Sequence, residues 1–286
     1  MGTIYDELKD ITNWLKYTPL DGHFYTYKNN VTFAAHKITD LYYQICNARM
    51  SLHFGVDFDK YSMMSESDMA ILSSKKYFIE NALLYYNFSV DYLWQVLWLY
   101  YDNSDEINEI PSNELYERIM KECDLDSLIR GLTEIHENKI VDVLKKEFSS
   151  KNSIYSEGRY YYNYLKHRAV FHTPSLGMND SVGMYPIPAL WRRDKENGEL
   201  LSYKIPLISR VELDIDKLKD LLMKFDRWFV ELCEYFIQLI IPKDYALASN
   251  IKILTMENYT KNHLDELEQY SKKHPEIVSK MKCDFE

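Results

Sequence analysis

The sequence predicts a mainly α-helical protein: a bundle of four to five long helices with a β-hairpin inserted before the last core helix. In several long segments, apolar residues recur at three- and four-residue steps, which is the period of one helix face. Eight glycines and eight prolines in 286 residues are few for a many-turned β architecture. Hydrophobic residues make up 46% of the chain, enough for a sizeable core. We therefore expect one helical domain over residues 1–286, with its bundle core at about 31–241.

The first two predicted helices are long and close together in the chain. Apolar residues from Val31 to Ile45 fall on one helix face, which predicts a helix over Val31–Ser51. A loop rich in Ser and Met follows, and Ser65 to Asp68 resembles a helix start. The run Asp68–Tyr101 is apolar on nearly all sides, so we expect a central, buried helix.

Two shorter helical regions follow. Pro111 and Ser112 open a region in which apolar residues keep the helical period over Leu125–Phe148, with Gly131 as a point where the helix is interrupted. The tyrosine-rich segment Arg159–His172 predicts another helix. This helix must end near Pro174, because the residue before a proline disfavours helical geometry.

The last part of the predicted bundle is a hairpin and a core helix. Residues 184–209 contain three prolines and an Asn197-Gly198 turn, a pattern typical of a β-hairpin. Asp214 then caps a strongly striped helix, Asp214–Ile241, which ends before Pro242. A peripheral helix is expected at about 260–273.

Composition excludes several classes of function. The net charge of −10 counts against a protein that coats nucleic acid nonspecifically, so a nucleic-acid site must be local. The four cysteines form no CxxC pair, which favours reduced thiols in a cytoplasmic protein over a zinc or disulfide framework. The N-terminus lacks the apolar core of a signal peptide, and Ala82 to Tyr100 is too polar for a membrane span. We expect no membrane association.

Common cofactor and metal signatures are absent from the sequence. It contains no P-loop, no GxGxxG and no GxSxG, and no Glu-x-x-His pair of a di-iron bundle. We therefore expect no cofactor and no metal.

One segment combines residues suited to phosphate chemistry. Arg159, Asn163 and His167 are spaced by four, so on a helix they share one face, with Lys166 beside His167. A histidine can move a proton, while Arg or Lys neutralises charge on phosphorus oxygens. This set predicts metal-independent chemistry on RNA.

At these residues the chain resembles the HEPN family, compact helical bundles of toxin, abortive-infection and RNA-processing systems. Asn163-Tyr-Leu-Lys-His167 is similar to the amide-to-His part of the family motif, and the order of helices over Val31 to Ile241 is also similar. The resemblance implies a dimeric endoribonuclease toxin or anti-phage effector, with a partner protein encoded nearby. His167 would act as acid or base, with Asn163 and Lys166 positioning the phosphate.

The sequence departs from the family where its Arg belongs, because Tyr162 precedes Asn163. Either the activity is lost or another cation substitutes. Arg159 is the first candidate, reaching His167 only through a bridging substrate, and Arg168, four residues before His172, is the second. An Arg of a partner chain in a homodimer would also complete the site.

Two functional hypotheses follow, besides a structural reading in which Asn163, His167 and Arg168 only cap a helix end. The first is the endoribonuclease. The second is a catalytically inactive HEPN-like module that binds RNA, a nucleotide or a protein partner. In either case Arg192 and Arg193, at the hairpin tip, form the natural second RNA contact, and His172 adds to the substrate-binding set. The homodimer surface should include part of Tyr85–Trp98.

Overall fold

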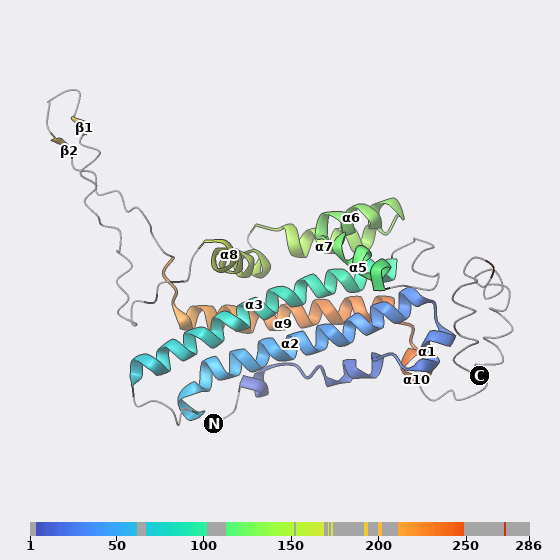
Figure 1. Ribbon diagram of the computed structural model, residues 1–286, viewed down its shortest axis with the longest axis horizontal. Helices are drawn as coiled ribbons and strands as arrows, with labels where there is room; N and C mark the ends of the chain where they lie inside the picture. The colour runs from blue at the N-terminus through green and yellow to red at the C-terminus, as the bar shows by residue number, and fades with distance from the viewer. Residues whose placement is uncertain are drawn as a thin grey trace. The chain divides into compact units, whose positions relative to one another are not determined.

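The structure is a computed structural model that describes residues 4–61, 67–101, 113–151, 153–168, 171, 173, 192–193, 200–201, 211–248 and 272. Helices dominate these residues, which confirms the mainly α class (Figure 1). The chain forms two compact units. Unit 1 comprises Met1–Lys9, Gln44–Val90 and Asp142–Glu231, and unit 2 comprises Asp10–Tyr43, Asp91–Val141 and Leu232–Glu286. The expectation of one domain over residues 1–286 stays a prediction.

The first two predicted helices are confirmed. Helix α3 spans Asp68–Tyr101, the bounds that the sequence predicts, and α2 spans Asn29–Tyr61, continuing past the expected end at Ser51. The continuation brings two more aromatic residues of α2, Phe54 and Phe58, against α3. Their rings lie 5.5 and 5.8 Å from that of Phe78 on α3.

A glycine allows α2 and α3 to approach closely in unit 1. A Cβ atom at Gly55 would lie 2.5 Å from Cγ1 of Ile79 and 3.1 Å from its backbone nitrogen. Real Cβ atoms do not approach other atoms this closely. Only glycine therefore fits here without moving the two helices apart.

The predicted helical region Leu125–Phe148 is helical, but its interruption lies after Glu134 rather than at Gly131. It consists of two helices, α6 (Leu125–Glu134) and α7 (Asn138–Ser149). His136 between them has a φ of 65°, and the amides of His136 and Glu137 donate to the carbonyls of Thr133 (3.1 Å) and Leu132 (2.9 Å). This is a Schellman turn, a common helix ending. Glycine usually occupies the position that His136 has here.

Gly131 is not the point of interruption. It lies inside α6, where a Cβ atom would meet the Trp98 ring at 3.7 Å, an ordinary contact. The short helix α5 (Asn113–Lys121) precedes α6, and the carbonyl of its Ile119 accepts a hydrogen bond from Nε1 of Trp98 (3.1 Å). Both contacts join this part of unit 2 to the last turns of α3.

A buried histidine joins the first and last helices of unit 2. His23 belongs to α1 (Asp21–Thr26), and Tyr245 begins α10 (Tyr245–Ala248). The amide of Leu20 donates to Nδ1 of His23 (2.9 Å), so Nε2 carries the proton and donates to the Tyr245 carbonyl (3.0 Å). Two short 3-10 helices, η1 (Ile4–Glu7) and η2 (Thr12–Tyr17), precede α1.

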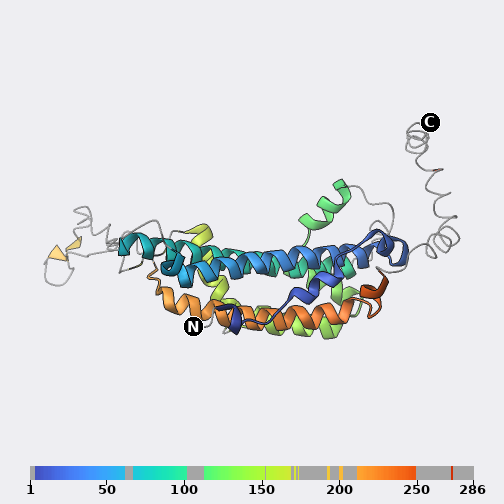
Figure 2. The same cartoon turned by 90° about the horizontal axis from the view of Figure 1, so that it is seen from below.

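The predicted last core helix is confirmed as α9 (Ile215–Ile240). The side chain of Asp214 caps it, accepting from the amides of Asp216 (3.0 Å) and Lys217 (3.2 Å). Its predicted apolar stripe is buried throughout: Leu218, Leu222, Phe225, Phe229, Leu232, Phe236 and Ile240. In unit 1, α9 runs beside α2 and α3 (Figures 1 and 2).

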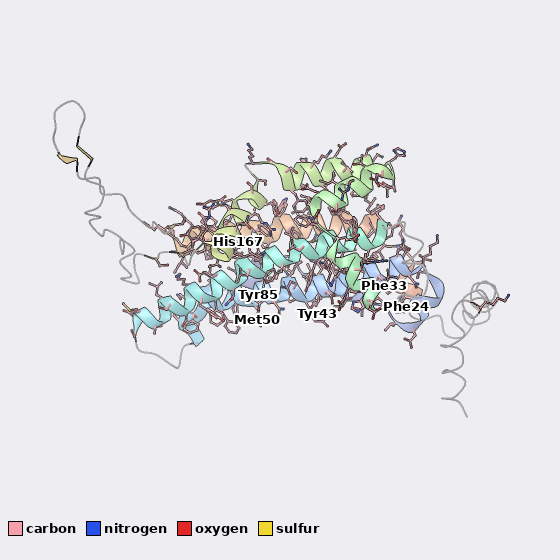
Figure 3. All side chains as sticks on the ribbon, turned by 45° about the horizontal axis from the view of Figure 1, so that its top comes forward. Phe24, Phe33, Tyr43, Met50, Tyr85 and His167 are labelled. Atoms are coloured by element: carbon pink, nitrogen blue, oxygen red, sulfur yellow. The ribbon has the colours of Figure 1, made fainter. Side chains whose placement is uncertain are left out.

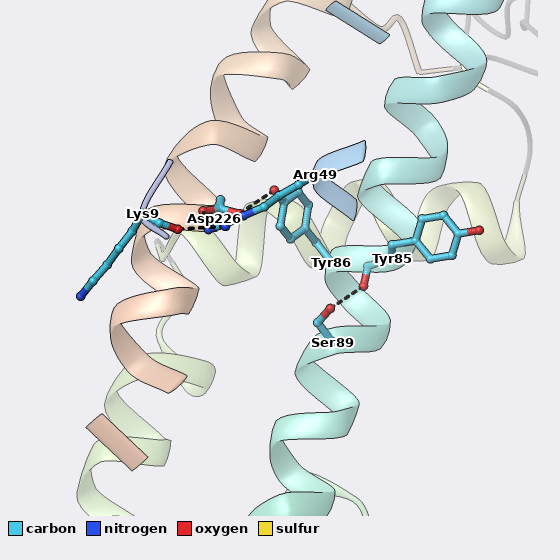
Figure 4. Close-up of polar contacts among 6 residues, drawn as sticks. All are labelled: Lys9, Arg49, Tyr85, Tyr86, Ser89 and Asp226. Carbon is cyan, nitrogen blue, oxygen red and sulfur yellow. Dashed lines mark hydrogen bonds and ion pairs between the residues drawn. The ribbon is translucent and has the colours of Figure 1, made fainter. Parts of the chain in front are cut away.

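A buried polar network ties these three helices together in unit 1 (Figure 4). The Asp226 carboxylate accepts from Nε (2.7 Å) and Nη2 (2.8 Å) of Arg49 and from the Tyr86 hydroxyl (2.8 Å). Nη1 of Arg49 donates to the Lys9 carbonyl (2.9 Å), so the network also holds the segment before α1. Burial and the neighbouring Asp226 raise the pKa of Tyr86 well above its ordinary value.

The predicted hairpin is described only in part. Strands β1 (Arg192–Arg193) and β2 (Leu200–Leu201) pair antiparallel, with Arg192 opposite Leu201 and Arg193 opposite Leu200. The other residues of 184–209 lie outside the described residues. So does the predicted helix at 260–273, except for Lys272.

Candidate functional site

The candidate site lies on α8 (Ile154–His167), the tyrosine-rich helix of unit 1. Its N-cap is Ser153, whose side chain accepts from the Ser156 amide (3.1 Å). The helix ends earlier than predicted, at His167 rather than near Pro174. The last helical hydrogen bond runs from the Arg168 amide to the Tyr164 carbonyl (2.9 Å).

The chain leaves α8 early because Phe171 is held in the core of unit 1. Its ring stacks on Tyr164 with the centroids 5.1 Å apart, and Nζ of Lys76 on α3 donates to its carbonyl (2.9 Å). The free energy gained by burying this aromatic side chain exceeds what one more turn of exposed helix would contribute. Phe171 therefore contacts both Tyr164 on α8 and Lys76 on α3.

One face of α8 packs into the core. A Cβ atom at Gly158 would lie 3.1 Å from the Phe225 ring of α9, and the Tyr162 ring meets Phe88 of α3 edge-on, with the centroids 6.2 Å apart. Tyr162 is 3% exposed. Tyr162 thus occupies a core position of unit 1.

The opposite face of α8 is open to solvent and holds most of the predicted site. Asn163, Lys166 and His167 on the helix and Arg168 at its C-cap are exposed, while Arg159 is half-buried. Figure 3 shows His167 on α8. The structure therefore brings these five predicted residues onto one helix end.

Two of the cations are held by the Tyr162 ring. Cζ of Arg159 lies 4.7 Å from the ring centroid, and Nζ of Lys166 lies 5.6 Å from it. Arg159 precedes Tyr162 by about one helical turn and Lys166 follows it by about one, so all three share a stripe. Both distances fit cation–π contacts, which hold the two charges at one aromatic ring without a carboxylate.

The basic residues of this helix end lack acidic partners. Within the described residues, Arg159, Lys166, His167 and Arg168 form no ion pair, and Nη1 of Arg159 is buried without a hydrogen-bond acceptor. By contrast, Lys76 nearby has Glu80 at 3.6 Å. An unsatisfied, buried guanidinium donor is costly unless an acceptor oxygen reaches it.

The remaining predicted site residues are Arg192, Arg193 and His172. Arg192 and Arg193 form β1, and only their backbone pairing is described. His172 lies outside the described residues. Their predicted role in binding stays a prediction.

The described ranges hold neither a metal-binding cluster nor a membrane-spanning helix. No three His, Cys, Asp or Glu side chains in those ranges gather in the way that metal ligands do. Nor does any helix there have the length and apolar content needed to cross a membrane.

The sequence hypothesis missed the role of Tyr162. It treated Tyr162 as part of a Tyr160–Tyr164 run that packs in the bundle, and as the residue in place of the Arg that the resemblance implies, but not as a ring that holds cations. The available signal was the spacing of Arg159 and Lys166, three before and four after an aromatic residue, which places both on its stripe.

Comparison with known proteins adds no relative. Neither a protein-family model, nor a curated protein, nor a solved structure matches the chain.

Proposed function

We propose that the protein is a HEPN-like, catalytically inactive module that binds RNA through the exposed end of α8. The observation that carries the proposal is that Arg159 and Lys166 both contact the Tyr162 ring and form no ion pair with any described residue, in a chain of net charge −10. An RNA phosphate supplies both the negative charge and the acceptor oxygens that these donors lack.

Helix-dipole compensation is the competing explanation. Cations at a helix C-terminus are favourable, typically by about 0.3–1 kcal/mol each, so Lys166, His167 and Arg168 stabilise α8 without any ligand. Compensation does not explain Arg159, which lies two turns before the helix end, outside the last turn where the dipole acts. The position of Arg159 therefore favours an external anion.

Binding is favoured over cleavage by the surroundings of His167. A catalytic base is usually oriented by a hydrogen-bonding partner, and the described residues give the His167 ring none. Tyr162, which occupies the position of the family's Arg, points into the core and leaves no cation adjacent to Asn163.

The binding test compares two double charge reversals by fluorescence anisotropy with a labelled single-stranded oligoribonucleotide. Lys166→Glu/Arg168→Glu should weaken binding at least about tenfold and lower the salt-dependence slope by about 0.7 for each phosphate that is no longer neutralised. The control, Lys121→Glu/Lys217→Glu, reverses two exposed lysines that pair with Glu117 and Asp214. This control has the same net charge as Lys166→Glu/Arg168→Glu, and it should bind RNA as tightly as the wild type does. Equal losses in both variants, or a wild-type protein that binds no RNA, would refute the proposal.

A metal-independent endoribonuclease is the second candidate function. It is favoured by the exposure of Asn163, Lys166 and His167 on one helix end, where a substrate can reach all three. If this reading is right, His167→Ala lowers RNA cleavage by about 10² or more with an unchanged melting temperature, and wild-type cleavage persists in EDTA. Absence of cleavage by the wild-type protein would leave only the binding module.

The proposal includes a cytoplasmic homodimer in a toxin or anti-phage setting, with a partner protein encoded nearby. Most of Tyr85–Trp98 is already buried within the chain, whereas Phe88 is exposed beside Tyr162. The dimer surface is therefore proposed around Phe88 and the end of α8. Light scattering on the wild type and on Phe88→Asp tests it, and a monomeric wild-type protein at micromolar concentration would exclude this assembly.

A further inference from the structure

Tyr160 is an exposed aromatic residue inside the cationic end of α8. It is 51% exposed and follows Arg159 directly. Asn163 and His167 come three and seven residues later, so the three side chains line one open face of the helix. An aromatic ring, an amide and cations thus share one surface.

The Tyr160 ring is positioned by a series of aromatic contacts. It meets the Tyr161 ring at 73° with the centroids 5.5 Å apart, and Tyr161 meets Phe171 at 67° and 5.7 Å. Phe171 is buried and fixed by its stacking on Tyr164. The exposed ring is therefore anchored, through Tyr161, to a side chain that cannot move freely.

One face of this ring is available for a ligand. Among the described residues, Tyr161 supplies the only ring contact of Tyr160, and one neighbour can cover at most one of its two faces. Exposure alone does not make a site, since Tyr77 on α3 is 61% exposed. The lysine beside Tyr77 is, however, already paired with Glu80 and with the Phe171 carbonyl. Tyr160 combines the open ring with a neighbouring cation that has no acidic partner among the described residues.

We infer that Tyr160 stacks on an unpaired base, so that the surface of α8 takes single-stranded rather than duplex RNA. The inference rests on the proposed RNA binding and names the form of the RNA. Bases inside a duplex are stacked on both sides and offer no free face, whereas a single strand can place one base on the ring while its phosphates reach Arg159 and Lys166. Asn163, on the same face, has the amide groups to contact the edge of that base.

The test measures the affinity of three probes by anisotropy and competition: a labelled oligouridylate, an RNA duplex of equal length, and tripolyphosphate, which has charge but no base. Wild type should bind the oligouridylate more tightly than the duplex. Tyr160→Ala should weaken oligouridylate binding by about 5- to 100-fold, the usual range when one stacking interaction is removed, and leave tripolyphosphate binding unchanged. Tyr160→Phe keeps the ring and should bind as the wild type does, and so should the exposed-tyrosine control Tyr77→Ala.

The outcomes separate this inference from the proposed function. If wild type binds RNA but does not discriminate single strands from duplex, and Tyr160→Ala keeps full affinity, the stacking inference is overturned while RNA binding stands. If wild type binds neither form, both are overturned. A melting curve for Tyr160→Ala that matches the wild type would show that a reduced affinity does not reflect impaired folding.

Discussion

Asp226→Asn is the sharpest test of what holds unit 1 together. Asp226 is fully buried and accepts three hydrogen bonds, two from Arg49 and one from the Tyr86 hydroxyl. Asparagine has nearly the same shape but no charge, and its Nδ2, in place of one carboxylate oxygen, can only donate. The substitution therefore leaves the Arg49 guanidinium buried without a counter-charge. It also places the NH2 group of the new asparagine against a donor of Arg49 or Tyr86.

The expected cost is about 3–5 kcal/mol of unfolding free energy, the usual range when one partner of a buried ion pair is removed. Urea unfolding followed by circular dichroism measures it, with Arg227→Ala as the matched control. Arg227 is the next residue and pairs with Glu7 at 3.2 Å, but these side chains are 52% and 65% exposed, so its removal should cost about 0–1 kcal/mol. The triple variant Arg49→Met/Tyr86→Phe/Asp226→Leu should recover most of the stability, since no buried charge remains. A midpoint for Asp226→Asn equal to that of Arg227→Ala would refute the reasoning.

Three further predictions concern stability. Phe225→Ala should cost about 3–5 kcal/mol, because the ring is fully buried, and an unchanged denaturation midpoint would mean that another face of α9 is in the core. His136→Gly should raise the unfolding free energy by about 1 kcal/mol, because glycine adopts the positive φ of this position without strain. The control His36→Gly, at an exposed position inside α2, should lower the unfolding free energy by about as much. A lower melting temperature for His136→Gly than for His36→Gly would contradict the Schellman turn. Burial raises the pKa of the Cys123 thiol from 9.0 to about 12, and burial with Asp244 raises that of Tyr27 from 10.0 to about 12. The unfolded chain thus loses these protons first, so stability should be complete below pH 9 and fall between pH 9 and 12. Cys123→Ala should move the onset upward, and a flat profile of urea midpoint against pH would contradict this.

The long helices could be predicted from the sequence because their signals are local. The start of α9 follows from the capping side chain of Asp214, and its buried stripe from the helical period of its apolar residues. The turn at His136 could not be predicted in this way, since the apolar period continues through it and neither glycine nor proline marks it. The early end of α8 could not be predicted either, because it depends on a contact between Phe171 and Lys76, which is distant in sequence.

The candidate site shows the same division. Its residues could be predicted, since spacing by four places Asn163 and His167 on one face, but the orientation of Tyr162 into the core depends on Phe88, which is remote in sequence. The network of Arg49 and Asp226 joins residues 177 positions apart. The sequence did hold a signal that both charges are buried. Arg49 follows Ile45 by four residues and Asp226 follows Leu222 by four, so each lies on the buried stripe of its helix.

The two ends of the segment 174–210 meet at a single side chain. Before it, Phe171 stacks on the Tyr164 ring, and after it, the Val211 amide donates to the Tyr164 hydroxyl (2.8 Å). A segment between two fixed ends can change length at a small cost in free energy, because each doubling of its length costs only about 0.6 kcal/mol in closure entropy. This stretch is therefore a natural place to exchange or insert sequence, and the geometry of α8 should be insulated from such changes as long as Tyr164 keeps both contacts.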